Sequence, residues 1–321
     1  MTRLNLTLVV AVVLAAAASL VAGRVWIDPA TTPNAYVILA ELRLPRTVLA
    51  LVIGAGLGAA GAAMQGYLRN PLADPGLFGV APGAALGGVL ALWSGGGNLG
   101  ALAVPVAALI GAGGAMALLA IIAGRSAGVA LFTLAGVMLA SLAGALTSLV
   151  ISLAPNAFAL AGIVTWLMGA LTDRSWTDVA IAGPLTLVGV MILLGAGRAL
   201  DALTLGEQAA RSLGIDPLAL RWLMILGVAL TVGSGVAVAG MIGFVGLIVP
   251  HLVRRYTDRS PSALIVPSAL AGALLVLLAD MACRLLPLVT ELRLGIALSL
   301  LGAPFFLHLL FRMRREGMAW T

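Results

Sequence analysis

The sequence predicts an all-α protein that crosses a membrane many times. Hydrophobic residues make up 62% of the 321 residues and charged residues only 9%, whereas soluble domains contain about 45–50% apolar and about 25% charged residues. The mean hydropathy is +1.14. Long apolar runs recur along the whole chain, which excludes a single signal peptide as their source. The lone cysteine, Cys283, excludes a disulfide scaffold.

Apolar runs define about ten candidate spans, because a helix needs about 20 apolar residues to cross the hydrocarbon core of a bilayer. In chain order they are residues 6–22, 47–68, 77–93, 99–123, 129–154, 179–197, 222–240, 241–253, 262–283 and 294–311. The stretch 222–253 is too long for one crossing. Gly240 and Gly243 mark a break in it, so we expect a full helix followed by a short half-helix. Residues 157–171 are too few to span and are expected at the membrane interface.

Ten spans would place both termini on the same side of the membrane. If that side is the cytoplasm, twelve of the 18 arginines lie in inner loops and six in outer loops, as the positive-inside rule requires. A weak inverted pseudo-repeat relates the two halves, because a glycine-rich helix precedes Asn70-Pro71 in one half and Pro250-His251 in the other. We expect residues 1–321 to form a single transmembrane domain with both termini cytoplasmic.

Glycines recur inside the second and third predicted spans. They are Gly54, Gly56, Gly58, Gly61, Gly79, Gly83 and Gly87. Small residues at this spacing let helix backbones approach closely in lipid. Three of them also match a dinucleotide-binding fingerprint, but they lie within a span and follow no strand. We therefore interpret these glycines as helix-packing positions.

The chain has no lysine, and all 18 basic residues are arginine. A P-loop requires a lysine beside the β- and γ-phosphates, so any ATP that drives this protein must be hydrolysed by another polypeptide. The arginines stand singly between apolar runs, which is typical of loops that flank spans and not of a nucleic-acid-binding surface. His251 and His308 have no carboxylate or cysteine at metal-ligand spacing. We expect no metal site, no cofactor bound by this chain and no nucleic-acid partner.

The longest polar excursion on the inner side lies between the sixth and seventh predicted spans. Glu207 precedes Arg211 by four residues, the favourable order for a helical pair. Gly214 can end that helix and Pro217 can begin the next one. We expect a short helix, a glycine turn and a second short helix on the cytoplasmic face.

This excursion could be an ordinary solvated linker or a docking site for a cytoplasmic protein. The small side chains of Ala209 and Ala210 would suit insertion into the groove of a partner. We favour docking.

Five segments, spread from about residue 40 to the C-terminus, together resemble the FecCD-type permeases of ABC importers for iron–siderophores, haem and cobalamin. In the family's order they are Arg43-Leu-Pro-Arg46, Asn70-Pro-Leu-Ala-Asp-Pro-Gly-Leu-Phe-Gly79, Glu207-x-Ala-Ala…Gly214, Gly243-Phe-Val-Gly-Leu-Ile-Val-Pro-His251 and Leu301-Gly-Ala-Pro-Phe-Phe306. The resemblance implies a ten-helix subunit that pairs with a second copy, with the translocation path between the copies. It also implies two ATPase subunits on the cytoplasmic side, which would bind ATP and Mg, and a periplasmic substrate-binding protein.

The resemblance implies roles for three groups of residues. Residues 203–216 would be the cytoplasmic coupling helices, with ATPase contacts at Leu205, Gly206, Glu207, Ala209, Ala210, Arg211, Leu213 and Gly214. Docking of the binding protein would use Arg43, Arg46 and Arg284, and Asp280 would pair with Arg284 and keep it aimed outward. The inner mouth of the path would be lined by Gln65, Asn70, Pro71 and Leu72. Arg293 stands where the family commonly has a proline.

The expected function is that of a non-catalytic permease subunit in the bacterial inner membrane, with an iron–siderophore complex as cargo and haem or cobalamin as alternatives. A secondary transporter driven by an ion gradient would bury ionisable groups near the midplane, and Asp280, the one acid well inside a predicted span, lies near its outer end. An intramembrane enzyme would need converging acid, base or nucleophilic groups. Mid-span hydroxyls such as those of Ser141 and Thr147 more often bond to carbonyls of their own helix.

Overall fold

A computed structural model describes residues 3–23, 32–95, 100–124 and 129–315. Helices are the only regular secondary structure within these ranges. Eight of the described helices are long and apolar enough to cross a membrane, which confirms the predicted all-α polytopic membrane fold. Residue 99, where one predicted span begins, lies outside the described residues.

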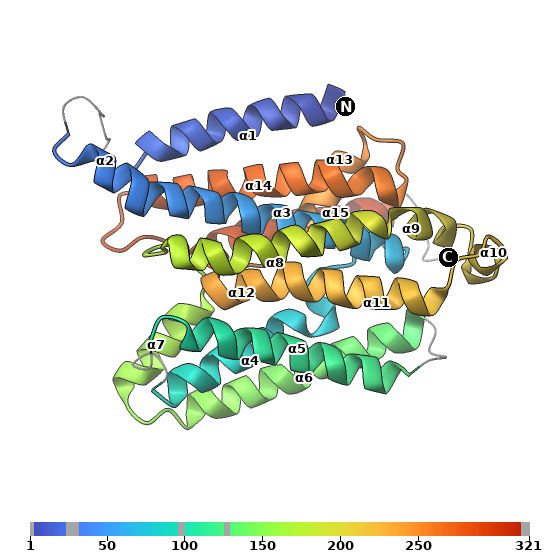
Figure 1. Cartoon of the computed structure of the whole chain (residues 1–321), viewed down its shortest axis with the longest axis horizontal. Helices are drawn as coiled ribbons and strands as arrows, with labels where there is room; N and C mark the ends of the chain where they lie inside the picture. Colours follow the sequence, from blue (N-terminus) through green and yellow to red (C-terminus); the bar gives the residue numbers. More distant parts are fainter. Residues whose placement is uncertain (1–2, 24–31, 96–99, 125–128, 316–321) are drawn as a thin grey trace.

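The long helices run side by side along the long axis of the molecule (Figure 1). The α-helices are α1 (Arg3–Val21), α2 (Ala35–Val37), α3 (Leu44–Tyr67), α4 (Val80–Trp93), α5 (Ala103–Ala123), α6 (Val129–Ser152), α7 (Ala157–Leu167), α8 (Trp176–Gly195), α9 (Gly197–Leu203), α10 (Glu207–Ser212), α11 (Pro217–Val228), α12 (Ser234–Ala239), α13 (Val245–Arg254), α14 (Pro261–Leu285) and α15 (Leu294–Arg315). Two π-helical turns, η1 (Ile38–Arg43) and η4 (Ala229–Gly233), and a 3-10 turn, η2 (Pro75–Phe78), complete them. The segments α11, η4 and α12 form one continuous span.

Each of the ten predicted spans contains a helix, but two of these helices are short. Helix α13 has 10 residues and α4 has 14, fewer than the roughly 20 that a full crossing needs. The short α13 agrees with the predicted half-helix. The predicted span 77–93 is helical as α4 only from Val80, because Gly79, with a φ of 78°, separates η2 from α4. The number of crossings and the membrane side of the termini stay predictions.

Helix α3 lies at the centre of the packing, against α14, α8 and α13. These helices approach closely because glycine has no side chain. A Cβ at Gly58 would overlap the carbonyl oxygen of Ser268 on α14, and one at Gly61 would overlap Gly246 on α13. Helices α4 and α5 meet in the same way at Gly87. The predicted role in helix packing is confirmed for these glycines, whereas Gly79 lies in the turn before α4.

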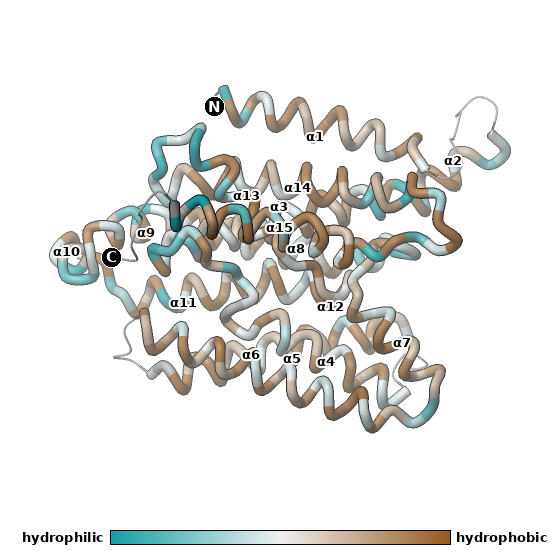
Figure 2. The backbone as a smooth tube through the Cα atoms, turned by 180° about the vertical axis from the view of Figure 1, so that it is seen from behind, coloured by the Kyte–Doolittle hydropathy of each residue, from teal (hydrophilic) through white to brown (hydrophobic). Residues whose placement is uncertain are grey.

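The hydropathy of the residues follows the arrangement of the helices. Hydrophobic residues run along the helices, and hydrophilic residues gather in the connections at the two ends (Figure 2). Large apolar side chains are exposed along the outer helices, among them Ile121 at 75% and Leu187 at 64%. Exposed apolar surface on this scale is expected of a protein whose surroundings are lipid.

Candidate functional site

The segment from α9 to α10 projects at one end of the bundle (Figure 1). Helix α10 ends in a Schellman motif, in which the Gly214 N–H bonds to the Arg211 carbonyl at 2.9 Å and the Ile215 N–H bonds to the Ala210 carbonyl at 3.0 Å. Gly214 has a φ of 81°, a conformation that glycine adopts without strain. The predicted helix end at Gly214 is confirmed.

Helix α11 begins immediately after this turn. Asp216 caps it by accepting a hydrogen bond from the Leu218 N–H at 2.9 Å, and Pro217 is its first residue. The predicted helix start is therefore also confirmed. Two well-formed caps separated by a short turn hold α10 in a defined orientation relative to α11.

The surface of the α10 turn is apolar at two exposed points. Leu205 is 68% exposed and Leu213 is 62% exposed. Ala210 is only 1% exposed, so it packs within this chain and is not available for insertion into a partner, contrary to the prediction. Glu207 and Arg211 both lie on α10, but no ion pair joins them among the described residues.

Gln65 joins α3 to α13. Its side chain is buried, its Nε2 donates to the Leu247 carbonyl at 3.3 Å, and its Oε1 accepts from Arg254 Nη2 at 2.8 Å. Both the nitrogen and the oxygen of the Gln65 amide therefore form hydrogen bonds with residues of α13. The prediction that Gln65 lines an open path is wrong, because a single sequence does not show which helix packs against a polar position.

The loop after α3 is a tight turn. Asn70 Oδ1 accepts from the Leu72 N–H at 2.9 Å, and the Asn70 N–H bonds to the Gln65 carbonyl at 3.1 Å. Asn70, Pro71 and Leu72 are half-buried. Their role at the gate stays a prediction.

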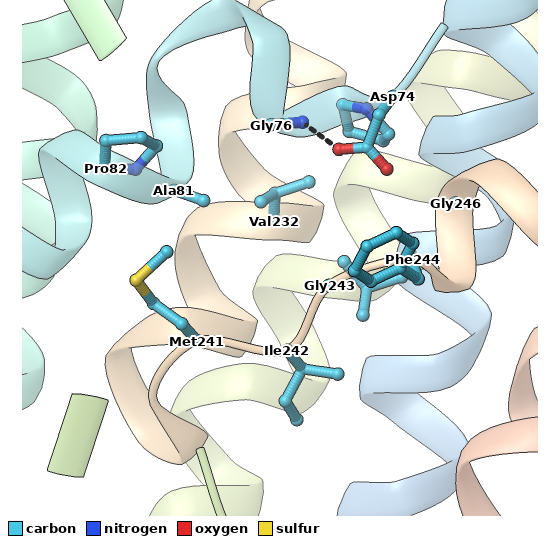
Figure 3. A pocket seen from close by; sticks show the side chains of 12 residues that line it. Asp74, Gly76, Ala81, Pro82, Val232, Met241, Ile242, Gly243, Phe244 and Gly246 are labelled. Atoms are coloured by element: carbon cyan, nitrogen blue, oxygen red, sulfur yellow. Dashed lines mark hydrogen bonds between the residues drawn. The ribbon is translucent and has the colours of Figure 1, made fainter. Parts of the chain in front are cut away.

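A cavity of 260 Å³ lies between this loop and the break that follows α12 (Figure 3). Asp74 contributes the carboxylate of an otherwise apolar lining. Its Oδ1 accepts from the Gly76 N–H at 2.8 Å, and burial raises the pKa of this carboxyl despite that hydrogen bond. In the view of Figure 3, Asp74 and Phe244 lie on one side of the cavity and Pro82 and Met241 on the other.

Residues 240–244 are non-helical, and residues 241–244 of this stretch line the cavity. Gly240 ends α12 with a φ of 72°, and Phe244 has a φ of 66°, a region that aromatic residues rarely adopt. A Cβ at Gly302 on α15 would overlap the Phe244 ring, so glycine is what makes room for it. Non-helical backbone at membrane depth is tolerated where it is buried or lines a cavity. The predicted break at Gly240 and Gly243 is confirmed.

Four charged side chains meet at the end of the bundle opposite α10. Arg46 donates to both oxygens of Asp280, with distances of 2.9 to 3.1 Å, and its Nη2 also donates to Glu291 at 2.9 Å. Arg284 Nε lies 3.1 Å from Asp280 Oδ2. We call Arg46, Asp280, Arg284 and Glu291 the four-charge cluster. Two positive and two negative charges balance within it.

Arg284 also binds the C-terminal end of α1. Its Nη1 donates to the carbonyl oxygens of Ser19 and Ala22, and its Nη2 donates to Ser19 Oγ at 2.6 Å. Arg43 Nη1 donates to the neighbouring Leu20 carbonyl at 2.9 Å. The last carbonyls of a helix lack helical partners and carry a partial negative charge, so cations stabilise this position.

The predicted pairing of Asp280 with Arg284 is confirmed, but the predicted outward orientation is wrong. The Arg284 side chain is 6% exposed and that of Arg46 is 12% exposed. Both side chains bind partners from distant parts of the chain. Residue spacing within one segment does not reveal such partners. Arg43 is half-buried, and its role in docking stays a prediction.

Sequence reasoning missed several residues of these sites. Glu291 has no role predicted from the sequence, yet it binds Arg46 and accepts from Thr172 Oγ1 at 3.1 Å. Burial alone would raise the pKa of Glu291, but the hydrogen bond and charge of Arg46 hold it below its ordinary value. Met241 and Phe244 line the cavity without a signal of their own, although the glycines beside them mark the break. Within the described part of the chain, no group of three His, Cys, Asp or Glu side chains could hold a metal ion.

A bundle of long apolar helices, a capped turn that projects at one end and a helix break beside a cavity define the membrane subunit of a transporter. The chain matches the model of the FecCD transport family over residues 6–312. It belongs to that family.

Similar proteins cover most of the chain. The uncharacterized ABC transporter permease YvrB of Bacillus subtilis (strain 168) is 39% identical over 285 residues, which are 87% of this chain and 80% of YvrB. The Fe(3+) dicitrate transport permease FecD of Escherichia coli (strain K12) is 39% identical over 282 residues, 87% of this chain and 86% of FecD. The vitamin B12 import permease BtuC of Salmonella paratyphi A is 36% identical over 316 residues, 98% of this chain and 96% of BtuC.

A solved structure described as an inward-facing conformation of a metal-chelate type ABC transporter has a TM-score of 0.90 and 33% identity to this chain. The structural match covers 97% of this chain and 100% of the chain in that structure. The protein is therefore a multi-pass ABC importer permease. Members of its family are non-catalytic transport subunits that function with ATPase and substrate-binding partners.

Proposed function

We propose that this chain is the permease subunit of an ATP-driven importer that moves an iron–siderophore complex across a bacterial inner membrane by alternating access. Two copies form the path between them. Two ATPase subunits, which bind ATP and Mg, dock at the α10 end, and a periplasmic binding protein docks at the opposite end. This chain binds no cofactor of its own.

The observation that carries this proposal is the construction of the α10 turn. Caps at Gly214 and Asp216 hold it rigidly, and Leu205 and Leu213 present apolar surface outside the bundle. The same chain lacks the lysine of a P-loop. A rigid apolar projection without a nucleotide site fits a subunit that is displaced by a separate ATPase.

The break at residues 240–244 supports alternating access. Helix segments on either side of a non-helical stretch can change their mutual orientation by rotation about few backbone bonds. The break lines a cavity together with the loop that carries Asp74 and Gly76. We place the inner gate in this region, with Asn70, Pro71 and Leu72 at its edge.

Docking of the binding protein belongs to the end that carries the four-charge cluster. Arg43 is half-buried beside the end of α1. We propose that it contributes to attraction of acidic residues of the binding protein. Arg46 and Arg284 would support this surface from below through their partners in the cluster.

The identity of the cargo is the more specific part of the proposal. Residues 70–79 resemble the corresponding segment of siderophore permeases, which favours an iron–siderophore complex. FecD and BtuC have similar identities to this chain, 39% and 36%, so identity does not separate an iron chelate from cobalamin. Cobalamin and haem stay alternative cargoes. Membership of the FecCD transport family argues against the alternative of another class, an ion-gradient-driven transporter.

Uptake into proteoliposomes tests the proposal. The permease is reconstituted with its ATPase and substrate-binding protein and is offered a ferric siderophore, haem or cobalamin in separate assays. We expect ATP-dependent uptake of the ferric siderophore. Uptake of haem or cobalamin instead would overturn the cargo assignment. Uptake driven by a proton or sodium gradient without ATP would overturn the class of transporter.

A further inference from the structure

Asp201 on α9 binds the first turn of α14. Its Oδ1 accepts from the Ser262 N–H at 2.9 Å, and its Oδ2 accepts from Ser262 Oγ at 2.6 Å. Ser262 is the second residue of α14, where backbone N–H groups lack partners within the helix. The local cap, Ser260, serves a different group, the Ala263 N–H at 3.4 Å. A carboxylate from another helix thus completes the cap of α14.

The surroundings of Asp201 hold α9 firmly against the start of α14. Leu200 and Leu203 of α9 are buried. Gly197 of α9 faces Ser262, and a Cβ there would lie 3.0 Å from the Ser262 Cβ. The two hydrogen bonds of Asp201 therefore sit within a packed contact and are not a chance surface interaction.

Helix α14 connects this contact to the far end of the molecule. Its 25 residues span about 37 Å at 1.5 Å per residue, and it connects Ser262, near its start, to Asp280 and Arg284 of the four-charge cluster, near its end. Helix α3 packs along it through glycine contacts at Gly54 and Gly58. Figure 1 shows α14 and α3 running together along the long axis, with α9 and α10 at one end. A displacement of the start of α14 would therefore be carried along the bundle, because close-packed interiors transmit strain.

We propose that Asp201 is a positioning residue that transmits movement of the α9–α10 segment to α14. It contacts neither cargo nor nucleotide and acts through Ser262. The inference rests on the proposed function, because it assigns the route by which ATP-driven displacement of α10 reaches the opposite end. Breaking the link would leave the ATPase able to bind and hydrolyse ATP but would waste that hydrolysis.

The test compares ATP hydrolysis with cargo uptake in the complete reconstituted complex. For Asp201→Ala we expect binding-protein-stimulated hydrolysis close to wild type and uptake per ATP reduced about fivefold or more, the range of ordinary coupling energies. Asp201→Asn keeps an acceptor for the Ser262 N–H and should restore most of the uptake per ATP. Ser262→Ala keeps the backbone bond and should have a smaller effect.

Asp258→Ala is the matched control. Asp258 accepts from Ser260 N–H and Oγ at 3.0 and 2.8 Å, so its loss removes a carboxylate near the same helix start without touching α9. We expect its uptake per ATP to equal that of wild type. If Asp201→Ala lowers hydrolysis and uptake in the same proportion, or lowers neither, the inference is overturned.

The same assay separates the role of Asp201 from the proposed function. A wild-type complex without ATP-dependent uptake contradicts the proposed function itself. A wild-type complex that imports cargo, together with an Asp201→Ala complex of unchanged coupling, contradicts only the role of Asp201. Should Asp201→Ala fail to assemble, Asp201→Leu, which keeps the size of the side chain but has no hydrogen-bond acceptor, measures the same link, and unchanged uptake per ATP in that variant overturns the inference.

Discussion

At the residue scale, arginine side chains make the ion pairs that join distant segments of the chain. The planar guanidinium of Arg46 spans two carboxylates, those of Asp280 and Glu291, which a lysine ammonium could not do with the same geometry. Arg284 divides its donors between Asp280 and the end of α1. Each of these arginines joins elements that are far apart in sequence, so their first role is to hold the end of the bundle together.

Removal of Arg46 tests this role. Arg46→Met would leave Glu291 without its cation and Asp280 with Arg284 alone. Because truncating one partner of a buried charge group leaves the other uncompensated, we expect a loss of stability of up to about 3 kcal/mol. Thermal unfolding of the detergent-solubilised permease measures it.

Arg198→Met is the control for that measurement, because Arg198 is exposed on α9. It should change the midpoint of unfolding little, since exposed charges contribute little to stability. Equal midpoints for the two variants would show that the four-charge cluster does not stabilise the fold.

Close backbone contacts organise the molecule at the element scale. Helix α3 touches α14 at Gly54 and Gly58 and touches α13 at Gly61, so three helices share one core without large side chains between them. In lipid, where hydrophobic burial does not drive helix association, such contacts supply the packing energy. The π-helical turn η4 and the break at residues 240–244 are the irregular elements beside this core, and both contribute to the cavity wall through Val232 and Phe244.

Two glycine-to-alanine substitutions separate packing from helix propensity. Gly58→Ala would place a Cβ against the Ser268 carbonyl, whereas Gly144 on α6 has open space around its Cβ position. We expect Gly58→Ala to reduce the yield of folded permease sharply. Gly144→Ala should be neutral or stabilising by up to about 1 kcal/mol, because alanine favours helix more than glycine does. Size-exclusion profiles and unfolding midpoints report both, and comparable behaviour of the two variants would refute the packing role.

The sequence predicts local features well because their causes are local. The glycine stop at Gly214, the proline start at Pro217 and the helix break at Gly240 all depend on backbone chemistry within a few residues. The orientations of Gln65, Arg46 and Arg284 depend on partners as distant as Arg254 and Ser19. A pattern within one segment does not identify such partners. The length of α4 was also overestimated, because an apolar run continues through the turn at Gly79.

The whole molecule has two ends with different chemistry, joined by tightly packed helices. One end carries the rigid α10 turn with exposed Leu205 and Leu213, and the other carries the four-charge cluster. The fold matches that of a metal-chelate type ABC transporter with a TM-score of 0.90. This arrangement suits a transport path that opens and closes when partner proteins bound at its two ends apply force to it.

Reconstitution of the purified chain by itself tests this view most directly. Proteoliposomes that contain only this permease are assayed for ATP hydrolysis and for cargo accumulation against a gradient, beside vesicles that also contain the ATPase and binding protein. We expect neither activity from the permease alone and both from the complete assembly. Hydrolysis of ATP or uphill transport by the isolated chain would contradict the account.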